Sequence, residues 1–424
     1  MLRAFINAFK IPDLRNKILF TILIIAVYRL GSHLPIPNVN FDVLASEVEQ
    51  QARGGVLEFI NLFSGGALTR LALFALGIMP YITSSIIMQL LTVVIPKLEQ
   101  WQKQGEMGVK KITQWTRYMT VTLALLQSTG LIFLFNNQFP GSIRVFTPSR
   151  VTFMVLTLTA GTAMIMWLGE LITQRGIGNG MSILIFTSII SRLPFEGASI
   201  LRVGGNLKFS VIVGLGLLII VAVVFMEQGQ RRIPVQYAKR VVGRRMTSGG
   251  STYIPLKVNQ AGVIPIIFAS SVLYFPTLIA SATGEGWFKS FVDRYLVNQG
   301  SIVYILIYGL LVVFFAYFYT AISFNPVDTA DNIRKYGGFI PGIRPGKPTS
   351  EYLQRILSRI TLPGSMFLAT IALVPSIVFA VWLLDPQTFP FGGTSILIVV
   401  GVALETMKQI ESQLTMRHYE GFLR

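Results

Sequence analysis

The feature that most constrains this chain is the recurrence of long apolar segments along almost its whole length. Polar, Gly-rich or Pro-rich breaks separate ten of them, at residues 18–36, 74–95, 116–135, 151–171, 181–193, 209–227, 260–280, 301–323, 361–384 and 391–410. A helix needs about 20 apolar residues to cross the hydrocarbon core of a bilayer. The sequence therefore predicts an all-α polytopic membrane protein with ten transmembrane helices.

The composition agrees with a membrane protein. Hydrophobic residues make up 52% of the chain and charged residues only 13%, against about 25% charged in ordinary soluble domains. The absence of cysteine excludes disulfides, thiolate metal sites and cysteine nucleophiles. The first apolar run is not followed by a small-residue cleavage site, so we interpret the N-terminus as mature sequence rather than a signal peptide.

The distribution of basic residues predicts the orientation in the membrane. If the N-terminus is cytoplasmic, 26 of the 36 Lys and Arg residues fall on the cytoplasmic side and nine on the opposite side. Cytoplasmic loops of membrane proteins carry an excess of Lys and Arg. We therefore expect both termini in the cytoplasm, and this distribution accounts for the net charge of +17.

Two of the predicted cytoplasmic loops, 227–259 and 325–355, are long and basic. One interpretation is retention of positive charge on the cytoplasmic side together with attraction to anionic lipid. The other is a docking surface for an anionic or RNA-rich partner, because several of the basic residues lie far out in the loops. The composition leaves both open.

No enzyme chemistry is evident in the sequence. The chain has two histidines, His33 and His418, and no HExxH, GxSxG or EF-hand pattern. The stretch PGIRPGKPTS lacks the first glycine of a phosphate-binding loop and has Pro348 where that loop needs Ser or Thr. We expect neither an enzyme active site nor a cofactor or metal site.

An ion-coupled transporter of small solutes is the alternative class. Such proteins usually keep ionisable groups near the middle of the membrane, but the second to ninth segments carry none in their central turns. They carry neutral polar groups instead, such as Ser84, Ser85 and Gln89. These groups would either bond between helices or line a path for a polar chain.

Residues 61–73, NLFSGGALTRLAL, pose a separate problem. The segment is too short to span, and it carries a Gly-Gly pair and Arg70 directly before a segment that is long enough to span. It is either a fixed re-entrant loop or a movable piece.

Motifs along the whole chain identify a family. They are PIPNVN, NLFSGGALTRLALFALGIMPYITSSIIMQLL, RGIGNGMSILIF, RRIPVQYAKRVVGRR, LKVNQAGVIPIIFASS, NPVDTADNIRKYGGFIPGIRPG and FGGTSILIVVGVALE. Because these motifs follow one another in this order along the whole chain, the sequence closely resembles the SecY family, the channel-forming subunits of bacterial protein translocases. The resemblance implies ten helices in two pseudo-symmetric inverted halves around an hourglass pore.

The resemblance also implies a division of the chain. In chain order, the parts are an amphipathic cytoplasmic segment (1–17), an N-terminal half (18–193), an external hinge loop (194–208), a C-terminal half (209–410) with basic loops 228–258 and 325–358, and a cytoplasmic tail (411–424). Within the N-terminal half, residues 60–73 would be the plug, a short helix that folds back into the external part of the pore.

The implied function is a channel that passes unfolded preproteins across the plasma membrane of a bacterium and releases transmembrane segments sideways into the bilayer. The implied partners are SecE-type and SecG-type small subunits, the motor ATPase SecA, the ribosome with its nascent chain, the signal sequences of preproteins, and membrane lipids including anionic lipid. No cofactor is implied.

Residue roles follow from the motif positions. The pore ring would be Ile78, Ile82, Met181, Ile185, Ile267 and Ile398. The plug would comprise Asn61, Leu62, Phe63, Ser64, Gly65, Gly66, Ala67, Leu68, Thr69 and Arg70. The lateral gate would involve Ser84, Ser85, Gln89, Thr92, Asn259 and Ser271, and the docking surface for SecA or the ribosome Lys239, Arg240, Arg244, Arg245 and Arg344. Met181 departs from the β-branched residues common at its position.

Overall fold

A computed structural model describes most of the chain, namely residues 9–40, 43–44, 61, 63–237, 240–242, 245–247, 251–282, 286–297, 301–382 and 393–420. Its longer helices are α2 (Pro12–Gly31), α6 (Met79–Val94), α8 (Glu106–Gln138), α9 (Pro148–Arg175), α10 (Gly180–Gln228), α11 (Ile264–Ala282), α13 (Ile302–Ser323), α15 (Lys347–Trp382) and α16 (Gly393–Glu420). Shorter elements are α7 (Pro96–Lys103), α12 (Trp287–Val292), the π-helix η2 (Asp293–Val297) and α14 (Pro326–Lys335).

Each of the ten apolar segments overlaps a helix, although α10 contains two of them. By length and hydropathy, five helices of the described residues are able to cross a membrane, or six if the bent pair α6–α7 counts as one span. The bend of 100° between these two helices lies at Ile95, where the following Pro96 disfavours the α conformation.

Local chemistry explains where several helices begin. Proline occupies one of the first two positions of α2, α6, α7, α9 and α14, where its missing N–H costs no hydrogen bond. The side chains of Asn179 and Asn325 cap α10 and α14 by accepting hydrogen bonds from backbone N–H groups of the first turn.

The region expected to be the external hinge loop, residues 194–208, differs from the prediction. The backbone is helical there, and it breaks only at Gly205, with φ 70° and ψ 176° inside α10. The sequence between Pro194 and Gly205 has no second helix-breaking proline, and glycine alone reaches such a conformation without strain. The join between the two halves is therefore a kinked helix rather than a loop.

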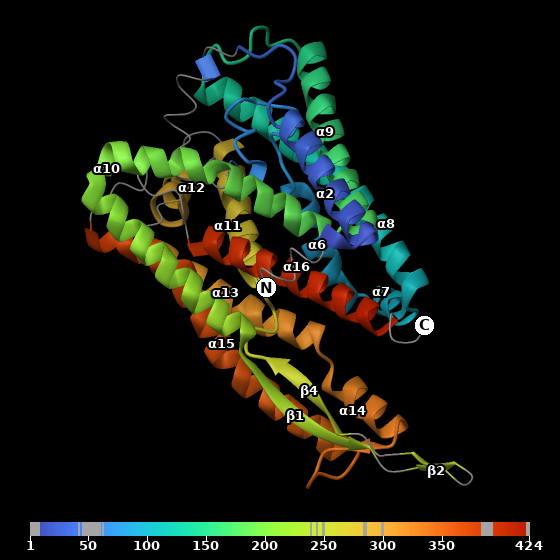
Figure 1. Ribbon diagram of the computed structural model, residues 1–424. Helices are drawn as coiled ribbons and strands as arrows, with labels where there is room; N and C mark the ends of the chain where they lie inside the picture. The colour runs from blue at the N-terminus through green and yellow to red at the C-terminus, as the bar shows by residue number, and fades with distance from the viewer. Residues whose placement is uncertain are drawn as a thin grey trace.

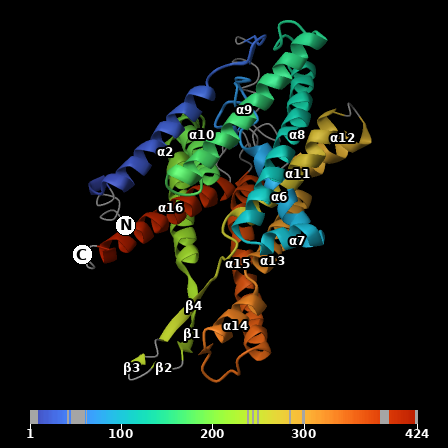
Figure 2. The same ribbon diagram turned by 90° about the vertical axis from the view of Figure 1, so that its right-hand side faces the viewer.

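The long helices pack into one bundle (Figures 1 and 2). Helix α8 lies between α6 and α9, α10 packs against α16, and α13 packs against α11 and α15. Helix α11 also touches α6 and α8, so it joins the helices of the N-terminal half to those of the C-terminal half. One hydrophobic core runs through all these helices.

The two basic loops, expected as loops, form a small folded unit at one end of the bundle (Figure 1). Strand β1 (Gln230–Tyr237) pairs antiparallel with β4 (Ser251–Lys257) and with β5 (Gly338–Phe339), which belongs to the other loop. Strands β2 (Arg240–Val242) and β3 (Arg245–Thr247) form a separate hairpin. Apolar side chains between the sheet, α14 and α15 form its core: Ile233, Val235, Leu256, Ile333, Ile340, Leu353 and Ile356.

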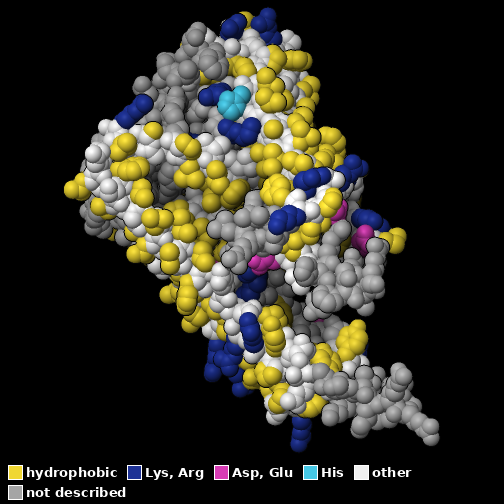
Figure 3. All heavy atoms as spheres, viewed as in Figure 1, with side chains coloured by type: hydrophobic (Ala, Val, Ile, Leu, Met, Phe, Trp, Pro, Cys, Tyr) yellow, Lys and Arg dark blue, Asp and Glu magenta, His cyan; other side chains and the backbone are white. Residues whose placement is uncertain are grey.

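The outside of the bundle is apolar. Figure 3 shows hydrophobic side chains over the visible flank of the helical part, and Lys and Arg side chains mostly toward its two ends and along one side. The most exposed candidate span is Gly205–Gln228, with a mean hydropathy of 3.0 and 11% of its apolar window buried. Such a helix is suited to contact with lipid rather than with water.

Candidate functional site

The segment predicted to be a short plug helix is mostly not helical. Phe63 and Ser64 are helical, but the chain then forms successive turns from Gly65 to Ile78, interrupted by a bridge at Ala72, and α6 begins at Met79 rather than at residue 74. The physical reason is a set of positive φ angles at Gly65 (64°), Gly66 (89°), Leu71 (40°) and Gly77 (56°). A right-handed helix does not accommodate them.

Most of this segment is nevertheless buried. Asn61, Phe63, Ser64, Ala67 and Leu68 are buried, whereas the side chain of Arg70 is exposed. Leu62 lies outside the described residues. The hydroxyl of Ser64 donates to the carbonyl of Asn61 and accepts from the backbone N–H of Leu68, and this pair of bonds substitutes for missing helical bonds.

A short backbone ladder fixes the far end of the segment. Ala72 forms an antiparallel bridge with Pro35, which follows α2. The N–H of Ile36 donates to the carbonyl of Leu71 at 3.0 Å, and the N–H of Leu73 donates to the carbonyl of Leu34 at 2.8 Å. Residues 71–73 are therefore held by the chain that follows the C-terminal end of α2.

The five isoleucines predicted for the pore ring lie in one hydrophobic cluster. Ile78 is the residue before α6, and Ile82 lies on α6; Ile185 comes from α10, Ile267 from α11 and Ile398 from α16. All five are at most 9% exposed. This cluster is the hydrophobic core of the whole bundle, so these isoleucines are core residues, and their arrangement as a ring stays a prediction.

Met181 is placed differently. Its side chain is half-buried, and its sulfur occupies the space that a side chain at position 169 would need, because a Cβ on Gly169 would lie 2.5 Å from the Met181 Sδ. The side chain therefore packs toward α9. Its role in the ring remains a prediction.

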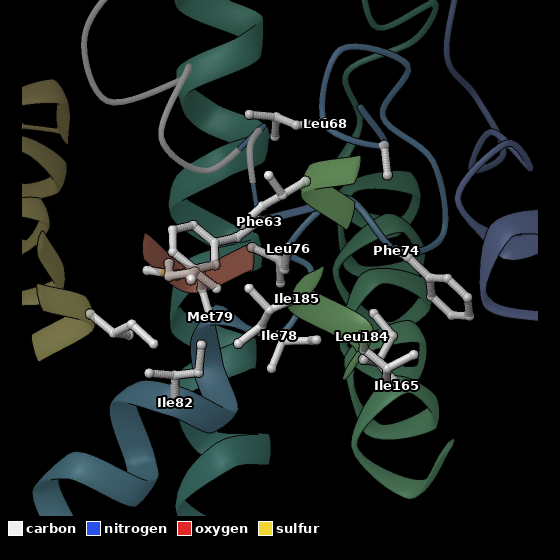
Figure 4. Close-up of a cluster of buried hydrophobic side chains, with 14 of the residues drawn as sticks. Phe63, Leu68, Phe74, Leu76, Ile78, Met79, Ile82, Ile165, Leu184 and Ile185 are labelled. Atoms are coloured by element: carbon white, nitrogen blue, oxygen red, sulfur yellow. The ribbon is translucent and has the colours of Figure 1, made fainter. Parts of the chain in front are cut away.

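Three further residues share the cluster and were not predicted as ring members. Figure 4 shows Phe63, Leu76 and Met79 grouped with Ile78 and Ile185. The sequence held a signal for Met79, which precedes Ile82 by three residues and so lies on the same face of α6. Phe63 had been expected only in the plug, and it lies beside Ile78 and Ile185, two of the residues predicted for the ring (Figure 4).

The residues predicted for the lateral gate lie in three settings. The hydroxyls of Ser84, Thr92 and Ser271 donate to backbone carbonyls of their own helices, at 2.7 to 2.8 Å. Ser85 is half-buried on α6. The amide of Gln89 lies beside the hydroxyl of Tyr319 and so links α6 to α13.

Asn259 lies elsewhere in the C-terminal half. Its amide donates to Glu227 at the end of α10 and to the carbonyl of Gly262 at 3.1 Å. The neighbouring carbonyl of Val258 packs against Gly364 of α15. These contacts fix the loop before α11 to α10 and α15.

Of the residues predicted for docking, Arg344 is the best described. It is exposed in a tight loop between Gly342 and Gly346, whose φ angles are 81° and 101°. Its carbonyl accepts a hydrogen bond from the hydroxyl of Thr349 at 2.9 Å. Arg240 and Arg245 lie on the β2–β3 hairpin, whereas Lys239 and Arg244 fall outside the described residues.

Sequence reasoning missed two polar links between helices. The guanidinium of Arg117 on α8 donates twice to the carboxylate of Glu170 on α9, at 2.8 and 2.6 Å. The hydroxyl of Tyr308 on α13 lies 3.2 Å from those of Ser270 on α11 and Thr394 on α16. No local sequence pattern indicates these links, because the partners lie tens of residues apart in the chain.

The comparisons with known proteins agree with this architecture. A family model described as SecY matches residues 72–407. The protein translocase subunit SecY of Streptomyces scabiei is 56% identical over 443 residues, and that of Mycobacterium bovis is 52% identical over 444 residues. Both alignments cover 100% of this chain and 100% of the relative.

Solved structures share the fold. A SecY structure concerned with the plug domain, which stabilises the closed state of that channel and maintains a membrane seal, gives a TM-score of 0.65 at 18% identity. Sec61 in the canine ribosome–channel complex from the endoplasmic reticulum gives 0.60 at 16% identity. Each comparison covers 96% of this chain and 96% of the other. The chain is a multi-pass membrane protein and belongs to the SecY family.

Proposed function

We propose that this chain is a protein-conducting channel, which passes unfolded preproteins across the membrane and releases transmembrane segments laterally into the bilayer. The observation that carries the proposal is the burial of Ile78, Ile82, Ile185, Ile267 and Ile398 in the hydrophobic core, which they reach from four helices, and we propose that they line one apolar ring. Such side chains offer no hydrogen bonds that would retain a passing polypeptide, and an apolar constriction excludes water and ions when it is empty.

The plug segment, residues 60–73, is proposed to close the external side of this ring. Supporting this, Phe63 packs into the same cluster as Ile78 and Ile185 (Figure 4). The turns at Gly65 and Gly66 make the segment compact. Because it is not a regular helix, no helix would have to unfold when the segment moves. A re-entrant loop that never moves is the competing interpretation.

The lateral gate is proposed to open between α6–α8 and α11–α13. The packing of α11 against α6 and α8, together with the contact of Gln89 with Tyr319, supports this location. Hydrophobic signal sequences and transmembrane segments of preproteins would leave through the opened seam. Ser84, Ser85, Thr92, Asn259 and Ser271 remain candidate members, and their individual contributions await tests.

The sheet-bearing end is proposed as the docking surface for SecA and for the ribosome. Arg240, Arg245 and Arg344 lie on it, and Lys239 and Arg244 belong to the same loop in sequence. The solved channels from canine and yeast sources are ribosome complexes. Small subunits of the SecE and SecG types and anionic lipid are the further proposed partners of the membrane-embedded part.

The proposed location is the plasma membrane of a bacterium, with both termini in the cytoplasm. Support comes from the excess of Lys and Arg on the side of the termini and from the bacterial source of the closely similar chains.

Reconstitution tests the function. The purified chain with its small subunits is inserted into liposomes, and a protease-protection assay measures how much signal-bearing preprotein reaches the lumen. Transport should require both SecA and ATP, and a preprotein without a signal sequence serves as the control. Absence of transport with all partners present would contradict the channel. Uptake of small solutes driven by an ion gradient would favour the transporter instead, which the purely apolar ring disfavours.

A further inference from the structure

The outer end of α2 contacts the plug segment through a charged side chain. The Nη1 of Arg29 donates to the carbonyl of Gly65 at 3.1 Å. Gly65 itself is closely confined, because a Cβ there would lie 2.8 Å from the Arg29 Nη1 and 3.1 Å from the Cα of Ser188 on α10. The first turn of the plug segment is thus wedged between α2 and α10.

The neighbouring residue on α2 links the same two helices. The hydroxyl of Tyr28 lies 2.6 Å from the Oγ of Ser188, and both side chains are fully buried. Ser188 donates its own proton to the carbonyl of Leu184 at 2.9 Å, so Tyr28 is the donor to Ser188. The Tyr28 ring also stacks on Phe74, with ring centroids 5.7 Å apart and planes 10° from parallel.

These contacts hold the plug segment at Gly65 and next to its C-terminal end. Arg29 binds the segment at Gly65, and Tyr28 contacts Phe74, the residue that directly follows the segment and its backbone ladder at residues 71–73. The hydrogen bond of Arg29 ends on a backbone carbonyl of the segment, so it exists only while the segment is in place. A charged donor makes this bond stronger than one between neutral groups.

The hold is limited by a second charge. Arg70 on the plug segment lies close enough to Arg29 to repel it electrostatically. Attraction at Gly65 and repulsion from Arg70 act on the same segment, so the net attachment is weaker than the hydrogen bond alone. A weak attachment suits a segment that must leave and return.

We propose that Tyr28, Arg29 and Ser188 form a latch that holds the plug segment closed, and that the latch sets how readily the channel opens. The proposal rests on the proposed channel function and assigns a positioning role to three residues outside the pore ring. Breaking the latch shifts the equilibrium toward the open channel without removing any part of the ring or the plug.

The test compares Arg29→Gln and Tyr28→Phe with the unaltered chain, each reconstituted with its small subunits. Tyr28→Phe keeps the stacked ring and deletes only the hydroxyl, so it removes the hydrogen bond to Ser188, the residue of α10 that confines Gly65. Arg144→Gln is the matched control, since it removes an exposed cation of the same outer side. Two quantities are measured: the resting ion conductance, and the SecA-driven transport of a preprotein with an impaired signal sequence.

We expect both latch variants to raise the resting conductance and to raise transport of the impaired preprotein about tenfold, the factor that corresponds to about 1.4 kcal/mol. Arg29→Lys should restore part of the seal, and Arg144→Gln should match the unaltered chain. If latch variants at normal protein levels leave both quantities unchanged, the latch is wrong. Transport of a preprotein with an intact signal sequence by the unaltered chain tests the proposed channel function separately. Failure of the channel function can therefore be distinguished from failure of the latch.

Discussion

Single polar residues connect neighbouring helices at several depths of this protein. Tyr28 with Ser188 links α2 to α10, and Arg117 with Glu170 links α8 to α9. Hydrogen bonds between membrane helices contribute only about 0.6 kcal/mol each on average, so these links add specificity of packing more than stability. The apolar ring has no such bonds, which is consistent with a constriction that opens and closes.

The ring gives a prediction for single substitutions. Replacing Ile82 and Ile185 by Gly or Ser should raise the resting ion conductance, because the smaller side chains leave a gap that water can enter. Ile190→Ser is the matched control, since Ile190 lies on the same helix as Ile185 but is exposed on the outside of the bundle. Planar-bilayer recordings measure the conductance. If the variant with both residues replaced conducts no more ions at rest than the unaltered protein, neither residue belongs to the ring.

Arg344 gives a second prediction at this scale. Arg344→Glu should lower SecA-driven transport about tenfold while insertion and protein levels stay normal, because the exposed guanidinium stands in a fixed loop and presents a bidentate donor to an acidic partner. Arg334→Glu makes the same charge change at an exposed site at the end of α14 and should have a smaller effect. Equal effects would indicate a general charge requirement instead.

At the scale of elements, the plug segment is attached by the bridge between Pro35 and Ala72, and this attachment allows a direct test of movement. The two residues face each other as a pair without mutual hydrogen bonds, for which the Cα atoms are about 4.5 Å apart, within the range that a disulfide spans. The chain has no native cysteine to interfere.

The double variant Pro35→Cys with Ala72→Cys should therefore form a disulfide on oxidation. We expect oxidation to abolish preprotein transport and a reductant to restore it, because the segment can no longer leave. The single variant Ala72→Cys controls for the substitution and for the oxidant. Full transport by the oxidised, cross-linked protein would favour the fixed re-entrant loop.

The helices could be predicted from hydropathy because each apolar segment is long enough to specify its own structure. The turns of the plug segment could not, since Leu71 adopts a positive φ that its side chain alone does not favour. The sheet was also missed. Its strand β5 has two residues and pairs with a strand about 100 positions earlier, and such pairing between distant loops leaves no local pattern.

The candidate site was predictable only through the resemblance. An isoleucine in a membrane helix has no sequence feature that distinguishes a pore position from a lipid-facing one, so Ile267 and Ile398 could not be chosen on periodicity. The latch residues were missed for a related reason. The partner of Arg29 at Gly65 is a backbone carbonyl, which no residue type reveals.

At the scale of the whole molecule, hydrophobic side chains cover the visible flank of the bundle (Figure 3), and most Lys and Arg residues of the sequence fall on the side expected to carry the termini. This distribution predicts the topology. Green fluorescent protein fused after residue 424 should fluoresce, and alkaline phosphatase inserted in the loop between α8 and α9 should be active, because that loop is expected outside. The reverse pattern of activities would contradict cytoplasmic termini.

The three-stranded sheet joins two loops that leave the membrane separately. Strand β4 is followed by α11 after residues 258–263, and β1 directly follows α10. The sheet is therefore connected through residues 258–263 to the start of α11, the helix that packs against α6 and α8. A force applied to the sheet would reach that packing through the backbone, without any group that enters the bilayer.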